Sequence, residues 1–337
     1  MLPPGNSDER GRLGEALIRR LTSIRSRWDT GAHPGIQRVV LGLAIAVFVV
    51  GGVWAYQRLD VEPGDLRWAP VLVAGFVGVP LAMSVNVAEY SVSASMTGHR
   101  VGFVAALRVT VVASAANLLP LPGGPLVRVQ ALRGLGATYR RAFAVTVFLA
   151  AVWAGVTALL AGTLILLLHS TALGIGILLA GMAGFTVACL LLRSEVGDGN
   201  QRVRHALAAV AVETASAGVA GFRLFLVLQG LGFDATITDA LVLALAGVLT
   251  SATGFVPGGL GVQELLSAAL APIVGLPPAA GFAASALDRV IGVFLYSPLG
   301  VILLIQRRLP SGSRQRGTND EHDPSSSAGE PPGTTGS

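Results

Sequence analysis

Long apolar stretches alternate with short polar segments along most of this 337-residue chain. A helix of roughly 20 mainly apolar residues is long enough to cross the hydrocarbon core of a bilayer. The pattern therefore predicts six membrane-spanning helices, at about residues 37–56, 69–90, 142–168, 171–192, 206–230 and 279–305. We expect an all-α integral membrane protein.

Two further apolar regions, about residues 101–136 and 236–276, are each interrupted by a Pro-Gly-Gly sequence. Helix-breaking backbone at membrane depth is tolerated only where protein or a water-filled cavity surrounds it. We therefore predict two re-entrant, broken helical hairpins. The leading arm of each, about 19 residues, is also long enough to span, so full crossing is the alternative.

The two ends of the chain are polar. Within residues 1–34, the residues Leu17, Leu21, Ile24 and Trp28 recur at helical spacing. This spacing indicates an amphipathic helix on the cytoplasmic membrane surface, or else a disordered tail with chance periodicity. Residues 309–337, rich in Ser, Gly, Pro and acids, are expected to be disordered and cytoplasmic.

Charge favours the re-entrant alternative. Only 13% of the residues are charged, and the net charge of +5 comes from arginines in loops and tails. Arginine concentrates in cytoplasmic segments. If both hairpins return to the side from which they enter, every arginine-rich segment and both termini lie on the cytoplasmic side of the inner (plasma) membrane.

The same composition excludes other classes of protein. No basic folded face carries interleaved aromatics, so we expect no nucleic-acid partner. Cys189 is the only cysteine, which excludes a disulfide within the chain. The five histidines are scattered over loops and tails, so no metal or other cofactor is expected.

The two Pro-Gly-Gly sequences begin at residues 122 and 257, which are 135 residues apart. The same offset carries the predicted helices of residues 35–168 onto those of residues 169–308. Each half has the order helix, helix, hairpin, helix. With the topology above, the halves form an inverted repeat whose hairpins enter from opposite faces, as in many transporters.

Two motifs accompany the breaks. The first is Asn117-Leu118-Leu119-Pro120 with Gly124, Val127 and Arg128. The second is Pro257-Gly258-Gly259-Leu260-Gly261-Val262-Gln263-Glu264, with Arg289 in the last helix. With these residues, the region of about 37–306 resembles the lysylphosphatidylglycerol synthase/flippase-like membrane domain family. Pro125 and the run Val147-Phe148-Leu149 depart from the family pattern, which usually has Glu and an acid–arginine group there.

Full-length members of that family join this domain to a soluble aminoacyl-transferase that moves lysine from tRNA onto a phospholipid. About 30 residues follow the last predicted helix here. The resemblance therefore implies the lipid-translocating part without the synthase part.

Six ionisable residues fall inside apolar segments, where a charge costs at least ~2.5–3.5 kcal/mol. They are Arg108, Glu213, Arg223, Glu264, Asp288 and Arg289. Three acids and three bases can pair without burying net charge. Glu264 either caps the returning arm of the second hairpin or pairs with Arg289 or a cationic head group. Asp288 is expected to meet Arg108 or Arg223, and Glu213 either accepts a proton or joins a structural pair.

At the first hairpin, Arg128 follows the amides of Gly123 and Gly124, a combination that suits a lipid phosphodiester. Alternatively, Arg128 anchors the cytoplasmic surface. Asn117 and Asn86 either hydrogen-bond at the hairpin tip or hold helices together. The expected substrate site is Asn117, Gly123, Gly124, Arg128, Gly258, Gly259, Glu264 and Arg289, with Arg108, Glu213, Arg223 and Asp288 as secondary candidates.

We therefore expect a lipid flippase that moves a phospholipid or related amphiphile between leaflets, either passively or driven by an ion, because no ATP-binding motif is present. Its partners would be membrane lipids and a second copy of the chain or an envelope-biosynthesis protein. One alternative is an enzyme of lipid or polyprenyl-phosphate chemistry that uses Glu264 or Asp288. Another is a non-transporting membrane partner of an envelope glycosyltransferase.

Overall fold

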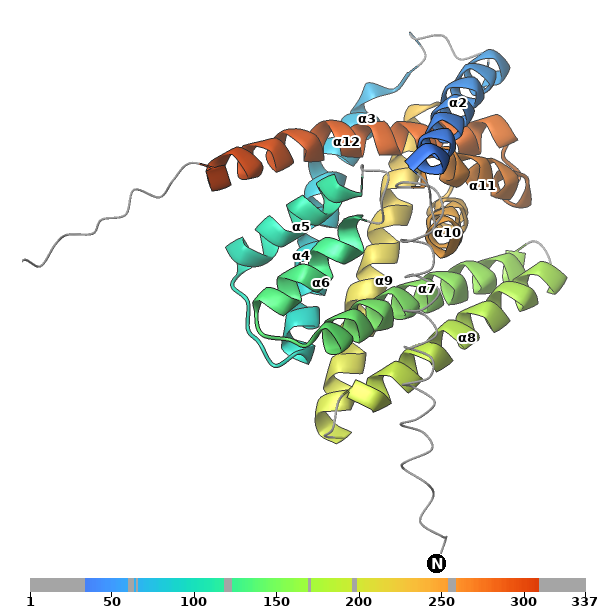
Figure 1. The fold of residues 1–337 in the computed structure, drawn as a ribbon. Coiled ribbons are helices and arrows are strands. Elements are labelled where there is room, and N and C mark those ends of the chain that lie inside the picture. Colours follow the sequence, from blue (N-terminus) through green and yellow to red (C-terminus); the bar gives the residue numbers. More distant parts are fainter. Residues whose placement is uncertain are drawn as a thin grey trace, which may run out of the picture.

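The computed structural model describes residues 34–59, 64, 66–117, 123–168, 171–195, 199–253 and 259–308, and these residues are almost entirely helical (Figure 1). No strand occurs within these ranges. The expected amphipathic helix at residues 17–28, the tail at 309–337 and Gly258 lie outside them.

Six helical segments are long and apolar enough to cross a bilayer, which confirms the predicted number and the all-α membrane class. The second of them is continuous through a π-helical turn, η1. The segments are α2 (Pro34–Leu59), α3–η1–α4 (Trp68–Val73, Ala74–Gly78 and Val79–Met96), α7 (Tyr139–Leu168), α8 (Thr171–Glu195), α9 (Gly199–Gly230) and α12 (Pro278–Arg308).

The two interrupted regions each form a pair of short helices. The first pair is α5 (Phe103–Ala116) and α6 (Gly123–Gly134). The second is α10 (Ile237–Thr253) and α11 (Val262–Leu270), followed by the 3₁₀ turn η3 (Ala271–Val274). The leading arms contain 14 and 17 residues, about 21 and 26 Å at 1.5 Å per residue. As described, both arms are shorter than the predicted length of about 19 residues, and the 14-residue arm is shorter than the ~17–25 residues of a spanning helix.

The order of elements repeats along the chain. The first half reads α2, α3–η1–α4, the α5–α6 hairpin and α7, and the second reads α8, α9, the α10–α11 hairpin and α12. Each element of the second half begins close to the predicted offset of 135 residues from its counterpart.

In Figure 1, α7 and α8 lie side by side beside one part of α9, while α12 crosses another part of it. Small residues allow the close α7–α8 contact. A Cβ atom on Gly174 of α8 would lie 2.7 Å from the backbone of Leu166, and one on Gly162 would lie 2.9 Å from the backbone of Leu178. Small residues at helix interfaces are typical of membrane bundles, in which packing rather than hydrophobicity brings helices together.

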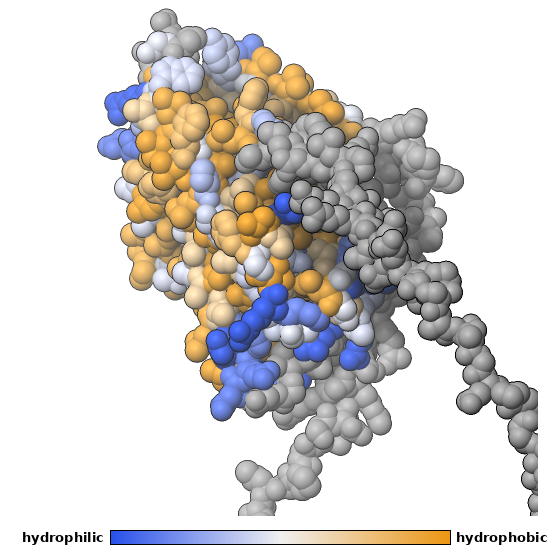
Figure 2. Space-filling model, turned by 90° about the vertical axis from the view of Figure 1, so that its left-hand side faces the viewer, coloured by the Kyte–Doolittle hydropathy of each residue, from blue (hydrophilic) through white to orange (hydrophobic). Residues whose placement is uncertain are grey.

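Large apolar side chains remain on the outside of the helices. Phe76, Leu167 and Phe294 are 69–75% exposed, and Figure 2 shows an extended apolar face with polar residues gathered towards its ends. An apolar surface of this extent is typical of helices that contact the lipid chains of a membrane. The chain is therefore a multi-pass membrane protein.

Candidate functional site

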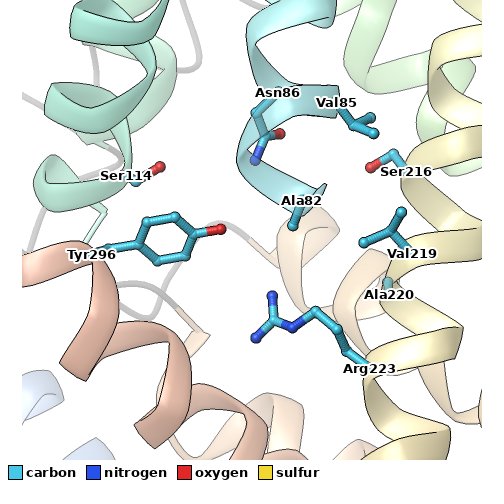
Figure 3. Close-up of a pocket in the computed structure, with 9 residues that line it drawn as sticks. All are labelled: Ala82, Val85, Asn86, Ser114, Ser216, Val219, Ala220, Arg223 and Tyr296. Carbon is cyan, nitrogen blue, oxygen red and sulfur yellow. The ribbon is translucent and has the colours of Figure 1, made fainter. Parts of the chain in front are cut away.

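A cavity of about 250 Å³ lies between α4, α5, α9 and α12 (Figure 3). Its wall combines one charged side chain and four other polar side chains with small apolar ones. The lining residues are Ala82, Val85, Asn86, Ser114, Ser216, Val219, Ala220, Arg223 and Tyr296.

Arg223 of α9 is the charged residue of the cavity. A Cβ atom on Gly78 would lie 2.6 Å from its Cγ, so the glycine at the end of η1 makes room for the side chain. The guanidinium Nη2 donates to the main-chain carbonyl of Asp288 at 3.2 Å and lies 2.8 Å from the Oδ1 atom of that residue. The buried Nε has no hydrogen-bond partner among the described residues. In Figure 3 the guanidinium points into the cavity towards Tyr296.

The other polar groups approach the cavity from four helices. The hydroxyl of Tyr296 donates to the main-chain carbonyl of Val79 at 3.3 Å, which fixes the ring beside η1. Asn86 and Ser216 face the cavity from α4 and α9, and Ser114 faces it from the end of α5. The cavity thus offers both donors and acceptors close to one guanidinium.

A second polar cluster joins α12 to the α10–α11 hairpin. The Nε of Arg289 donates to Oε1 of Glu264 at 2.5 Å, and its Nη2 donates to Oε1 of Gln263 at 3.0 Å and to the carbonyl of Gly259 at 3.3 Å. Glu264 is fully buried and lies in the first turn of α11, as predicted. The predicted pairing of Glu264 with Arg289 is confirmed.

The break of this hairpin needs glycine. Gly259 has a φ of +68°, and a Cβ atom there would lie 2.2 Å from Cγ2 of Thr250. A side chain would be strained by the backbone and would also collide with α10.

The tip of the first hairpin is held by Asn117. Its Oδ1 accepts a hydrogen bond from the amide of Gly124 at 2.9 Å, which confirms the predicted bond across the tip. A Cβ atom on Gly123 would lie 2.2 Å from the carbonyl oxygen of Ala116. Only glycine therefore lets α6 start so close to the end of α5.

Beyond this tip, Arg128 of α6 forms an ion pair with Glu89 of α4. Glu213 of α9, only 2% exposed, interacts electrostatically with both residues. The guanidinium that the sequence assigns to a lipid phosphate is thus engaged by a carboxylate of the protein.

The remaining predicted site residues are placed as follows. Asp288 meets Arg223, one of its two expected partners. Arg108 is exposed on α5 and has no partner among the described residues. Arg223 is the one predicted residue that lines the cavity, whereas Arg128, Glu264 and Arg289 surround it in ion pairs.

Sequence reasoning missed Glu89, Tyr296, Ser114 and Ser216. The second helix was predicted to end at residue 90, so Glu89 stood at its edge, but α4 continues to Met96 and places it inside. Tyr296 and the two serines carry no signal that distinguishes them from ordinary residues of apolar helices, because only the packing of four helices brings them together.

α12 connects the two hairpins. Arg289 binds the second hairpin at Gly259, and Tyr296 faces the cavity together with Ser114 from the first. Seven residues of helix separate them, about 10.5 Å along the axis. α12 therefore links the cavity, which Ser114 of the first hairpin lines, to Gly259 of the second hairpin.

Comparisons with known proteins point to one family. Residues 192–300, which include Glu213, Arg223, Glu264, Asp288 and Tyr296, match the family described as the lysylphosphatidylglycerol synthase TM region. A UPF0104 membrane protein from Pyrococcus horikoshii is 28% identical over 86 residues, which make up 26% of this chain and 26% of that protein. The chain thus matches about a quarter of the length of this relative. Residues 192–300 are thus similar to the membrane region of the lysylphosphatidylglycerol synthase family, the family that the second motif and Arg289 predict.

Proposed function

We propose that this protein moves a phospholipid or a related amphiphile between the leaflets of the plasma (inner) membrane, with both termini in the cytoplasm. The observation that carries the proposal is the polar cavity around Arg223, which lies inside a bundle of apolar helices and beside the end of α5 in the first hairpin.

The energetics of lipid translocation explain why such a cavity matters. The main barrier is the transfer of a polar head group out of water. Arg223 and Asn86 supply donors that replace part of the head group's hydration. Arginine suits a phosphodiester because its planar fork can bind two oxygen atoms.

The size of the cavity fits a head group but not a whole lipid. Sites that enclose a drug-sized ligand are ~300–1,000 Å³, and this cavity is about 250 Å³. The head group would occupy it while the acyl chains stay in the surrounding lipid, against the exposed apolar side chains of the helices.

The arrangement of the hairpins suggests how access would alternate. The second hairpin is bonded to α12 through Gly259 and Arg289. The first hairpin faces α12 across the cavity, where Ser114 and Tyr296 both form part of the wall. Movement of one tip relative to α12 would open the cavity to one leaflet while the other tip keeps it closed. The name of the matched family refers to a phospholipid, phosphatidylglycerol, which supports a phospholipid as substrate.

Lipid redistribution in proteoliposomes tests the proposal. Fluorescent phospholipids are reconstituted with purified protein, and the fraction reached by an impermeant quencher is followed over time. Arg223→Gln should slow the exchange by at least about tenfold, because a hydrogen bond to a charged group is worth ~1.5–3 kcal/mol. Tyr296→Phe, which removes only the hydroxyl group, should reduce the rate less.

Arg100→Gln is the matched control, because Arg100 is an exposed arginine in the loop before α5. It should exchange lipid at the wild-type rate. The proposal is wrong if folded, monodisperse wild-type protein exchanges no class of phospholipid faster than empty liposomes do, or if Arg223→Gln and Arg100→Gln behave alike.

A further inference from the structure

Two carboxylates act on the guanidinium of Arg128, one through an ion pair and the other at longer range. Glu89 of α4 forms an ion pair with Arg128 of α6, and Glu213 of α9 interacts electrostatically with both. With both acids ionised, this group of three side chains carries a net negative charge.

Glu213 is the deeper of the two acids. It is 2% exposed, and its Oε1 is buried without a hydrogen-bond partner among the described residues. It stands in one row with Ala209 and Ala217, one helical turn away on either side. Both alanines belong to an apolar cluster with residues of α4, α7 and α8. Glu213 therefore lies in a mainly apolar part of the protein interior.

Among the described residues, the charged groups that act on Glu213 are Glu89 and Arg128. From α4 the group is faced by Glu89 and by Tyr90, which interacts with Arg128. On α7 the only charged residues are Arg140 and Arg141 in the first turn, where Arg141 binds the carbonyl of Met96. On α8 the charged residues are Arg193 and Glu195, in its last turn.

We propose that Glu213 is a proton-binding site that couples lipid movement to the proton gradient, an inference that rests on the proposed function. A proton cancels the uncompensated charge and turns an acceptor-only carboxylate into a group that also donates. It needs one oxygen atom, whereas metal cations need several ligands. The described residues contain no group of three or more His, Cys, Asp or Glu side chains able to hold a metal ion.

The placement of Glu213 connects it to the substrate cavity. Ser216 follows it by three residues and Asn86 precedes Glu89 by three, and both line the cavity, about 4.5 Å along each helix axis. Arg128 lies on the returning arm of the hairpin whose leading arm brings Ser114 to the same cavity.

This geometry gives the proton a defined effect. Glu213 takes up a proton from one aqueous side, and Arg128 is then held by Glu89 alone. When the proton leaves to the other side, the two carboxylates compete for the guanidinium and pull on α6, and so on the hairpin beside the cavity. One proton is bound and released in each cycle, and no covalent bond of the lipid changes.

Infrared spectroscopy of reconstituted protein tests for the bound proton directly. At neutral pH the wild type should show the carbonyl band of a buried, protonated carboxylic acid. The band should be absent in Glu213→Gln and retained in Asp234→Asn, which neutralises an exposed acid in the α9–α10 loop. The glutamine is similar in size and neutral, so the variant should fold. Absence of the band from the wild type, or its retention in Glu213→Gln, overturns the inference.

Transport under an imposed pH gradient tests the coupling. With one proton per lipid, a gradient of one pH unit should shift the distribution of lipid between the leaflets by up to about tenfold. Glu213→Gln should abolish this shift and still bind lipid. Wild-type exchange that ignores the pH gradient, or that follows a sodium gradient instead, contradicts proton coupling. If no lipid moves at all, the proposed function fails, and the infrared band alone then decides whether Glu213 holds a proton.

Discussion

At the scale of single residues, the ion pair between Glu264 and Arg289 is costly as well as stabilising. Glu264 is fully buried, and its Oε2 has no hydrogen-bond partner among the described residues. Removing two charges from water is repaid only when the geometry is good and the remaining polar atoms are satisfied. Arg289 also bonds Gln263 and Gly259, so the pair positions the hairpin tip more than it adds to stability.

Removing one member of this pair should therefore be worse than neutralising both. We expect Glu264→Gln to lower the free energy of unfolding by about 3–5 kcal/mol, because it leaves the guanidinium of Arg289 buried without its carboxylate. The double variant Glu264→Gln/Arg289→Gln should cost clearly less than the sum of the two single changes. SDS-induced unfolding in mixed micelles measures all four proteins of the cycle. Additive costs would mean that the two side chains do not interact.

The residue-level predictions succeeded where charge balance constrains the answer. Burying unpaired charge in a membrane is expensive, so Glu264 had to meet an arginine, and Asp288 had only two candidates, of which Arg223 is the partner. The cavity could not be anticipated in this way. Its residues are spread from Ala82 to Tyr296, and the sequence contains no information on which faces of four helices converge.

At the scale of elements, glycines determine how closely the hairpins and helices approach. At the crossing of α11 and α12, a Cβ atom on Gly281 would lie 2.4 Å from the carbonyl oxygen of Ser267 and 2.8 Å from Cβ of Ala271. At mid-length of α9, by contrast, a Cβ atom on Gly218 would meet nothing within 4 Å. Two helical glycines thus serve different purposes.

The substitution Gly281→Ala should destabilise the protein, because the new methyl group forces α11 away from α12. The expected loss is about 1–3 kcal/mol, the usual cost of overpacking. Gly218→Ala should instead be neutral or stabilising by up to ~1 kcal/mol, since alanine favours the helix and the space is open. SDS unfolding of the two variants compares them directly. Equal effects would contradict the close contact at Gly281.

Element order was predictable from the chain, whereas element ends were not. Apolar length and the two glycine breaks predict six spanning helices and two hairpins, and the structure contains them. The second spanning helix continues to Met96 rather than to residue 90. Local hydropathy falls towards the polar end of α4, but its backbone hydrogen bonds and its contacts with α9 extend the helix past that point. That extension brings Glu89 into the interior.

At the scale of the whole molecule, an inverted repeat requires the two hairpins to enter from opposite faces of the membrane. The two halves share the order helix, helix, hairpin, helix. With six spanning segments and hairpins that return, the first half crosses the membrane three times, so the second half must begin on the other side. In the proposed mechanism, this arrangement would let the cavity face the two leaflets in turn.

Chemical mapping of the membrane topology checks this arrangement. Arg133 at the end of α6 and Arg204 near the start of α9 are both exposed and both predicted to be cytoplasmic. Asp234, which is exposed in the α9–α10 loop, is predicted to lie on the other side. Single cysteines are introduced as Arg133→Cys, Arg204→Cys and Asp234→Cys in a background without Cys189, which is itself exposed. An impermeant maleimide applied to intact cells should label only the third variant, and applied to inverted vesicles only the first two. If Arg133→Cys and Arg204→Cys react from opposite sides, one hairpin region crosses the membrane completely. The inverted repeat, and with it alternating access through the cavity, would then be wrong.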